Sequence, residues 1–145
     1  MLVVASFWLG ASALAAPEGV DQVVRALSAR DGVTCGEVEA LTGTPVETLR
    51  AVVDTVAMPP WVPMRAAQCL MEQHAVEVKE DLLVWVSDPA KKGLGFLVLA
   101  ALDRLPIEVA VPVAQKALAE GPDHERAVAK VGAAAAPELR ALVSR

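Results

Sequence analysis

At 145 residues, the chain is long enough for one domain with a hydrophobic core and short for two. Hydrophobic residues make up 54% of it, yet only 3% of the residues are aromatic and tyrosine is absent, a composition typical of closely packed helices. The net charge of -5 is modest and the basic residues are scattered from Arg25 to Arg145, which argues against nucleic-acid binding through a basic stripe.

Residues 1–15 have the pattern of a signal peptide. No charged residue precedes Glu18, and the segment LVVASFWL has about the length of a signal h-region. Ala13 and Ala15 supply small side chains where a signal peptidase reads them, so we expect cleavage after Ala15 and a periplasmic or secreted protein. The pattern lacks the usual Lys or Arg near Met1. The alternative is an uncleaved membrane anchor, since the apolar run reaches the lower length limit for a span.

A first helix is expected directly after this leader. Val20, Val23, Val24 and Leu27 recur at the spacing of one helix face, and the helix is expected to end near residues 31–32.

Two capping boxes are expected next. Thr34 and Glu37 have the spacing at which the two side chains satisfy each other's backbone N–H groups, which predicts a short second helix through Leu41. The same spacing recurs at Thr44 and Glu47, at the start of a third helix.

The chain contains two cysteines, Cys35 and Cys69. In an oxidising compartment we expect them to form a disulfide, which closes a loop of about 35 residues and contributes roughly 3 to 4 kcal/mol in the chain-entropy model. Two separate buried thiols are the alternative. A zinc site that adds His74 and His124 lacks the close ligand pairs of structural zinc, so we expect no metal.

The stretch MPPWVPMRAAQCL, residues 58–70, predicts a junction between two regions. Pro59 and Pro60 cannot continue a helix, so the third helix is expected to end by about Ala57. A fourth helix is then expected to begin at about Val62.

Internal similarity begins at this junction. WVPMRAAQCL (61–70) aligns with GLGFLVLAAL (93–102) at an offset of 32 residues. A third copy, ERAVAKV (125–131), aligns with MRAAQCL when Arg126 is laid on Arg65. We therefore expect three helical hairpins. Their helices are expected at 62–73 with 76–86, 94–103 with 106–119, and 124–131 with 137–144.

These motifs resemble HEAT-like repeats of the short bacterial type, roughly 30 residues long, in which an Arg-Ala-Ala stretch on the first helix precedes a polar turn and an apolar second helix. The resemblance covers about Trp61 to Arg145. It implies an all-α fold, an α-solenoid of antiparallel helical hairpins. Residues 16–57 would form an N-terminal helical cap, and residues 58–145 the repeat domain, as one structural unit with the cap.

The resemblance also implies a role for two arginines. Arg65 and Arg126 are expected to stabilise the stack by reaching a carboxylate or carbonyl of a neighbouring repeat. The acceptors expected near the turns are Asp54, Asp88 and Asp103.

No residue pattern predicts catalysis, since neither an HExxH nor a GxSxG motif occurs. We expect no enzyme and no cofactor. The repeats imply a monomeric scaffold in the cell envelope that binds a protein partner, with no nucleic acid and no membrane span after cleavage. Trp61 and Trp85 are expected in the core, with one of them partly exposed on the partner-binding surface. The alternatives are an enzyme resembling HEAT-like cofactor lyases, which attaches or detaches a prosthetic group, and a membrane-tethered assembly factor.

Overall fold

The computed structural model describes residues 17–29 and 31–144, and every regular element in these two ranges is helical. The all-α class is therefore confirmed. The expected signal peptide and its cleavage site after Ala15 lie outside the described residues. The α-helices are α1 (Val20–Ser28), α2 (Cys35–Glu39), α3 (Pro45–Thr55), α4 (Trp61–His74), α5 (Lys79–Ser87), α6 (Lys92–Ala100), α7 (Ile107–Glu120), α8 (His124–Gly132) and α9 (Pro137–Arg140). Two short 3-10 helices, η1 (Pro89–Lys91) and η2 (Leu102–Arg104), flank α6.

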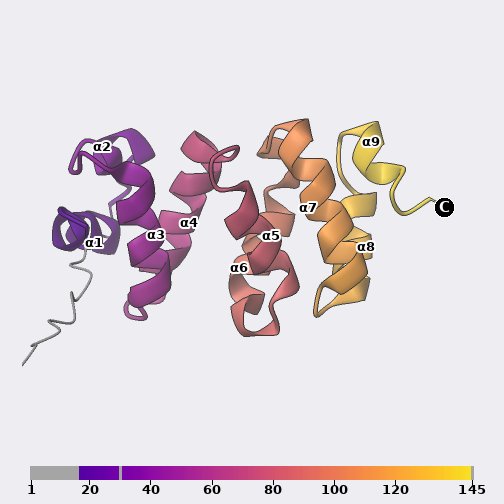
Figure 1. Cartoon of the computed structure of the whole chain (residues 1–145), viewed down its shortest axis with the longest axis horizontal. Helices are drawn as coiled ribbons and strands as arrows, with labels where there is room; N and C mark the ends of the chain where they lie inside the picture. Colours follow the sequence, from indigo (N-terminus) through magenta and orange to yellow (C-terminus); the bar gives the residue numbers. More distant parts are fainter. Residues whose placement is uncertain (1–16, 30, 145) are drawn as a thin grey trace, which may run out of the picture.

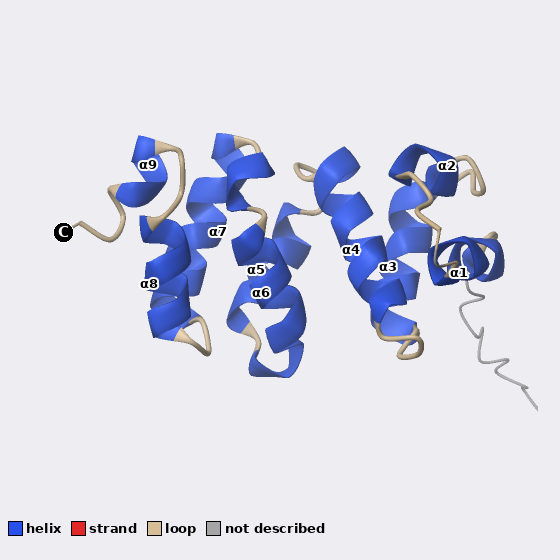
Figure 2. Ribbon diagram, turned by 180° about the vertical axis from the view of Figure 1, so that it is seen from behind, coloured by secondary structure: helices blue, strands red, loops and turns tan. Residues whose placement is uncertain are grey.

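The helices follow one another in a row along the long axis of the molecule (Figure 1). Helices α4, α6 and α8 contact one another in succession, and α5, α7 and α9 do the same. The two sets form two layers, which are seen from opposite sides in Figure 1 and Figure 2. Helix α1 packs against both α3 and α4, so the expected cap region and the expected repeat region are packed together.

Helix pairing differs from the expected hairpins in the first unit. Helix α4 packs most extensively against α3, whereas α5 packs against α6 and α7. The physical reason lies in the connection, because Val78 N–H donates to His74 C=O at 3.0 Å and keeps the chain in helical turns after α4. A tight reversal that would place α5 along α4 does not form. Helix α9 is also shorter than expected and ends at Arg140.

One of the two expected capping boxes is confirmed. Thr34 Oγ1 accepts from Glu37 N–H at 3.2 Å, and Glu37 Oε2 accepts from Thr34 N–H at 2.8 Å. The backbone bond and then the hydroxyl bond from Thr34 lower the pKa of Glu37 below its ordinary value.

The capping box expected at Thr44 and Glu47 is wrong. Thr44 N–H donates to Thr42 Oγ1 at 3.1 Å, so the donor that Glu47 would satisfy is already engaged. The Thr44 hydroxyl lies 3.4 Å from the hydroxyl of buried Thr48.

The residue before α1, Gly19, has a left-handed backbone conformation. Gly19 has a φ of 89°, in the left-handed region where a side chain is disfavoured. A Cβ at this position would lie 3.0 Å from Leu41 O, so the small residue also permits close approach of the loop before α3.

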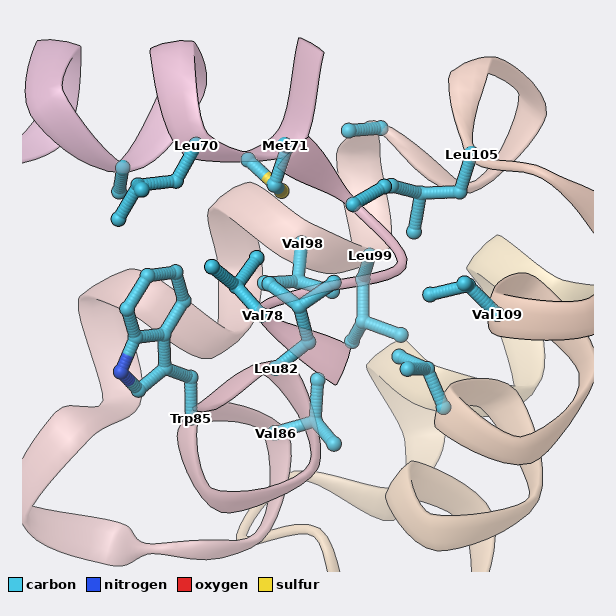
Figure 3. Packing of buried hydrophobic residues seen from close by; sticks show 14 of the residues in the cluster. Leu70, Met71, Val78, Leu82, Trp85, Val86, Val98, Leu99, Leu105 and Val109 are labelled. Carbon is cyan, nitrogen blue, oxygen red and sulfur yellow. The ribbon is translucent and has the colours of Figure 1, made fainter. Parts of the chain in front are cut away.

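The hydrophobic core runs through the middle of the row without interruption. Figure 3 shows its central part, where side chains from α4, α5, α6 and α7 meet. Trp85 of α5 is 3% exposed and packs within this cluster. Gly95 of α6 lies against α5 so closely that a Cβ would come within 2.6 Å of Trp85 O. The core therefore depends on a glycine where α5 and α6 meet.

None of the helices in the described part of the chain combines the length and the apolar composition that a membrane span requires.

Candidate interaction surface on helix α4

A disulfide joins Cys35, the first residue of α2, to Cys69 in α4, with 5.3 Å between the two Cα atoms. The expected pairing is confirmed, and the alternative of two separate thiols does not hold. Cys69 is 3% exposed, whereas Cys35 is half-buried and lines a hollow of about 350 Å³. Cys35 is therefore the more accessible of the two cysteines, although both line the hollow.

A second link between α2 and α4 lies one helical turn further along α2. His74 Nε2 pairs with Glu39 Oε1, and His74 Nδ1 lies 3.5 Å from Glu77 Oε1. With the disulfide, this pair fixes both ends of α2 on α4. Among the described residues, no group of three or more His, Cys, Asp and Glu side chains is placed to hold a metal ion.

Arg65 reaches helix α1, and its acceptors are backbone carbonyls. Nη1 donates to Leu27 O at 2.8 Å and to Ala29 O at 2.7 Å. These carbonyls belong to the C-terminal end of α1, where helical acceptors lack partners and a positive charge is favourable.

The carboxylate acceptors that we expected for Arg65, Asp54, Asp88 and Asp103, are wrong. Two of them are engaged by backbone groups near other turns, because Asp88 Oδ1 accepts from Ala90 N–H at 2.9 Å and Asp103 Oδ1 accepts from Ala135 N–H at 2.8 Å.

Arg126 contacts a neighbouring unit through an aromatic ring. Its guanidinium carbon lies 3.9 Å from the centroid of Phe96 in α6, and Lys92 Nζ lies 5.6 Å from the same centroid. The carboxylate nearest to Arg126 is Asp123, at 3.7 Å in the same segment of chain. The expected carboxylate or carbonyl of a neighbouring unit is therefore replaced by a cation–π contact.

The two tryptophans that we considered for a binding surface are not equivalent. Trp61, the first residue of α4, is 42% exposed. Trp85 is buried in the core, so Trp61 is the one of the two that is partly exposed, and a partner-binding role for Trp61 stays a prediction. The indole of Trp85 packs where α5 faces the neighbouring helices, and a ring of that size in the core has no area left to offer a partner.

Three hollows on the outer side of α4 share lining residues with one another and are here together called the α4 groove. The first, beside the disulfide, includes Arg65, Gln68 and Glu72. The second lies between α4 and η2, where Gln68, Met71 and Glu72 face Arg104. The third, of about 270 Å³, continues from Glu72 and Arg104 to the C-terminal end of α4. The residues that define the α4 groove are Arg65, Gln68, Met71, Glu72, Arg104 and Leu105.

The side chains of the α4 groove combine an apolar floor with polar walls. Met71 and Leu105 are buried beneath exposed Gln68, Glu72 and Arg104. Such a mixture offers hydrophobic contact, two positive side chains, one negative side chain and an amide, which is the chemistry of a peptide-binding surface. Sequence reasoning did not single out Gln68 or Glu72, although their spacing from Arg65 places all three on one face of the helix.

Comparison of the chain with protein-family models, with curated proteins and with solved structures finds no match.

Proposed function

We propose that the chain is an exported, non-catalytic binding module that holds a segment of a protein partner in the α4 groove. The observation that carries this proposal is that the three hollows adjoin in turn. The first and second share Gln68 and Glu72, and the second and third share Met71, Glu72 and Arg104. An extended segment fits such a surface better than a small molecule does, since each hollow alone is open and shallow.

The proposal includes a HEAT-like repeat architecture, and burial at the aligned positions supports it. Leu70 in α4 and Leu102, which aligns with it, are both buried. The same holds at the following aligned pairs: Val78 with Ala110, Leu82 with Ala114, and Trp85 with Ala117. Stacked units of this kind present extended surfaces to partners.

Export is supported by the disulfide and by the composition of the leader. Disulfides persist in oxidising compartments and are rare in the cytosol of mesophiles. The link between Cys35 and Cys69 and the uncharged apolar residues before Glu18 therefore favour the same location, the periplasm or the exterior of the cell. We propose that the module acts there as a monomer.

Site-specific photo-crosslinking tests the groove. A benzophenone amino acid placed at Gln68, in the groove, is compared with the same amino acid at Gln115, which is exposed on α7 in the other layer. After irradiation of the exported protein in intact envelopes, we expect one adduct of discrete mass at position 68 and none at position 115. The absence of an adduct at 68, or the same adducts at both positions, contradicts the proposal.

A further inference from the structure

The two sulfurs of the disulfide differ in access. Cys69 is 3% exposed in the interior face of α4, whereas Cys35 is half-buried at the start of α2. Both cysteines border the hollow of about 350 Å³ at the disulfide end of the α4 groove, together with Gly32, Val33 and Thr34 from the loop before α2. An external reagent that enters this hollow therefore meets Cys35 before Cys69.

A carboxylate also lies beside the disulfide. Glu72 Oε2 is 3.3 Å from Cys35 Sγ. Arg65 lines the same hollow, but its guanidinium donates to Leu27 O and Ala29 O. The negative charge of Glu72 therefore disfavours the approach of a thiolate to Cys35.

We propose that Cys35 is a site of covalent modification by small thiols such as glutathione. The attacking thiolate forms a bond to Cys35 Sγ, and the Cys35–Cys69 bond breaks with its electron pair on Cys69 Sγ. The thiolate of Cys69 then takes a proton from solvent. The product carries a mixed disulfide at Cys35 and a thiol at Cys69, so the small thiol is oxidised and Cys69 is reduced.

The surroundings favour this direction of attack. The sulfur that is attacked belongs to Cys35, the more accessible of the two cysteines. Glu72 has the opposite effect, because its carboxylate repels the thiolate that approaches Cys35. Glu72 thus lowers the rate of the exchange, while the greater accessibility of Cys35 determines which sulfur is attacked.

Modification removes the covalent link between α2 and α4. Helix α2 has only five residues, and after exchange it is held by the His74–Glu39 pair and by its packing on α1 and α4. The added group occupies the disulfide end of the α4 groove, where Arg65, Gln68 and Glu72 lie. Exchange at Cys35 therefore changes the shape of that surface.

Peptide mapping after reaction with glutathione tests the site. The oxidised full-length protein is incubated with reduced glutathione under native conditions, quenched with N-ethylmaleimide and digested for mass spectrometry. We expect glutathione on the peptide that contains Cys35 and maleimide on the peptide that contains Cys69. Glutathione on Cys69, an even distribution over the two cysteines, or reaction only after denaturation in urea overturns the proposal.

The rate of the same reaction tests the role of Glu72. Glu72 Oε2 lies 3.3 Å from Cys35 Sγ, and a unit charge at about 4 Å from the attacking thiolate changes the rate about five-fold in water, so Glu72→Gln is expected to raise the rate by about that factor. Glu80→Gln is the matched control, because Glu80 is exposed on α5 and does not line the hollow, and its rate is expected to equal that of the unmodified chain. Equal rates for the two variants overturn the electrostatic assignment. No binding partner enters either assay, so failure here is distinct from failure of the proposed binding function.

Discussion

Arg65 shows how one side chain in the repeated motif can stabilise a different helix. Its two hydrogen bonds satisfy Leu27 O and Ala29 O, which the end of α1 leaves without helical partners. Arg65 also lines the same hollow as the two cysteines of the disulfide that holds α2. A single residue of α4 therefore fixes α1 and borders the link to α2.

Replacement of Arg65 by glutamine is expected to lower the free energy of unfolding by about 2 kcal/mol, because two hydrogen bonds from a charged donor are lost, one part-buried and one exposed. Urea denaturation followed by circular dichroism measures the change. Arg25→Gln serves as the control, since Arg25 is exposed on α1, and a change within about 0.5 kcal/mol is expected for it. Equal destabilisation by both substitutions would show that the carbonyl contacts of Arg65 contribute nothing specific.

At the scale of the helix, local sequence patterns predict where a helix begins better than they predict which other helix it packs against. The capping box at Thr34 forms because both of its members are free to meet, and the one at Thr44 fails because Thr42 has already engaged the backbone donor. Neither the spacing nor the residue types of Thr44 and Glu47 reveal that competition. The packing of α4 against α3 likewise depends on the turn after His74 and on contacts in the core. The helical spacing of apolar residues predicts neither of these.

The contact between α5 and α6 depends on Gly95, and Gly95→Ala is expected to destabilise the fold by about 2 kcal/mol. The added methyl group would lie 2.6 Å from Trp85 O, and a backbone oxygen in a packed core yields only if the two helices separate. Gly93→Ala, on the same helix, is the matched control, because no heavy atom lies within 4 Å of a Cβ there. Since alanine favours helix, that variant is expected to gain up to about 1 kcal/mol. Urea midpoints that move in the same direction for both variants would contradict the close approach.

For the whole molecule, composition and period predicted the helical class and the cysteine count predicted the disulfide. The repeat alignment also placed Leu70 and Leu102 at buried positions. What it did not predict is the α4 groove, because Arg104 and Leu105 meet α4 only through packing of segments more than thirty residues apart. Which of the two tryptophans is exposed was not predicted for a related reason, since burial of a large side chain depends on which helices surround it.

At the scale of the whole chain, the intact mass of the exported protein measures both where its N-terminus lies and whether its cysteines are joined. If the apolar leader is a signal peptide, the exported protein begins at Ala16, because Ala13 and Ala15 occupy the positions that a signal peptidase reads. We expect that mass, and we expect no increase in it when the denatured, unreduced protein is treated with iodoacetamide, since both cysteines are in the disulfide. Reduction before alkylation is the control and is expected to add two carbamidomethyl groups. A mass that begins at Met1 would instead support the uncleaved anchor, and alkylation without reduction would contradict the link between α2 and α4.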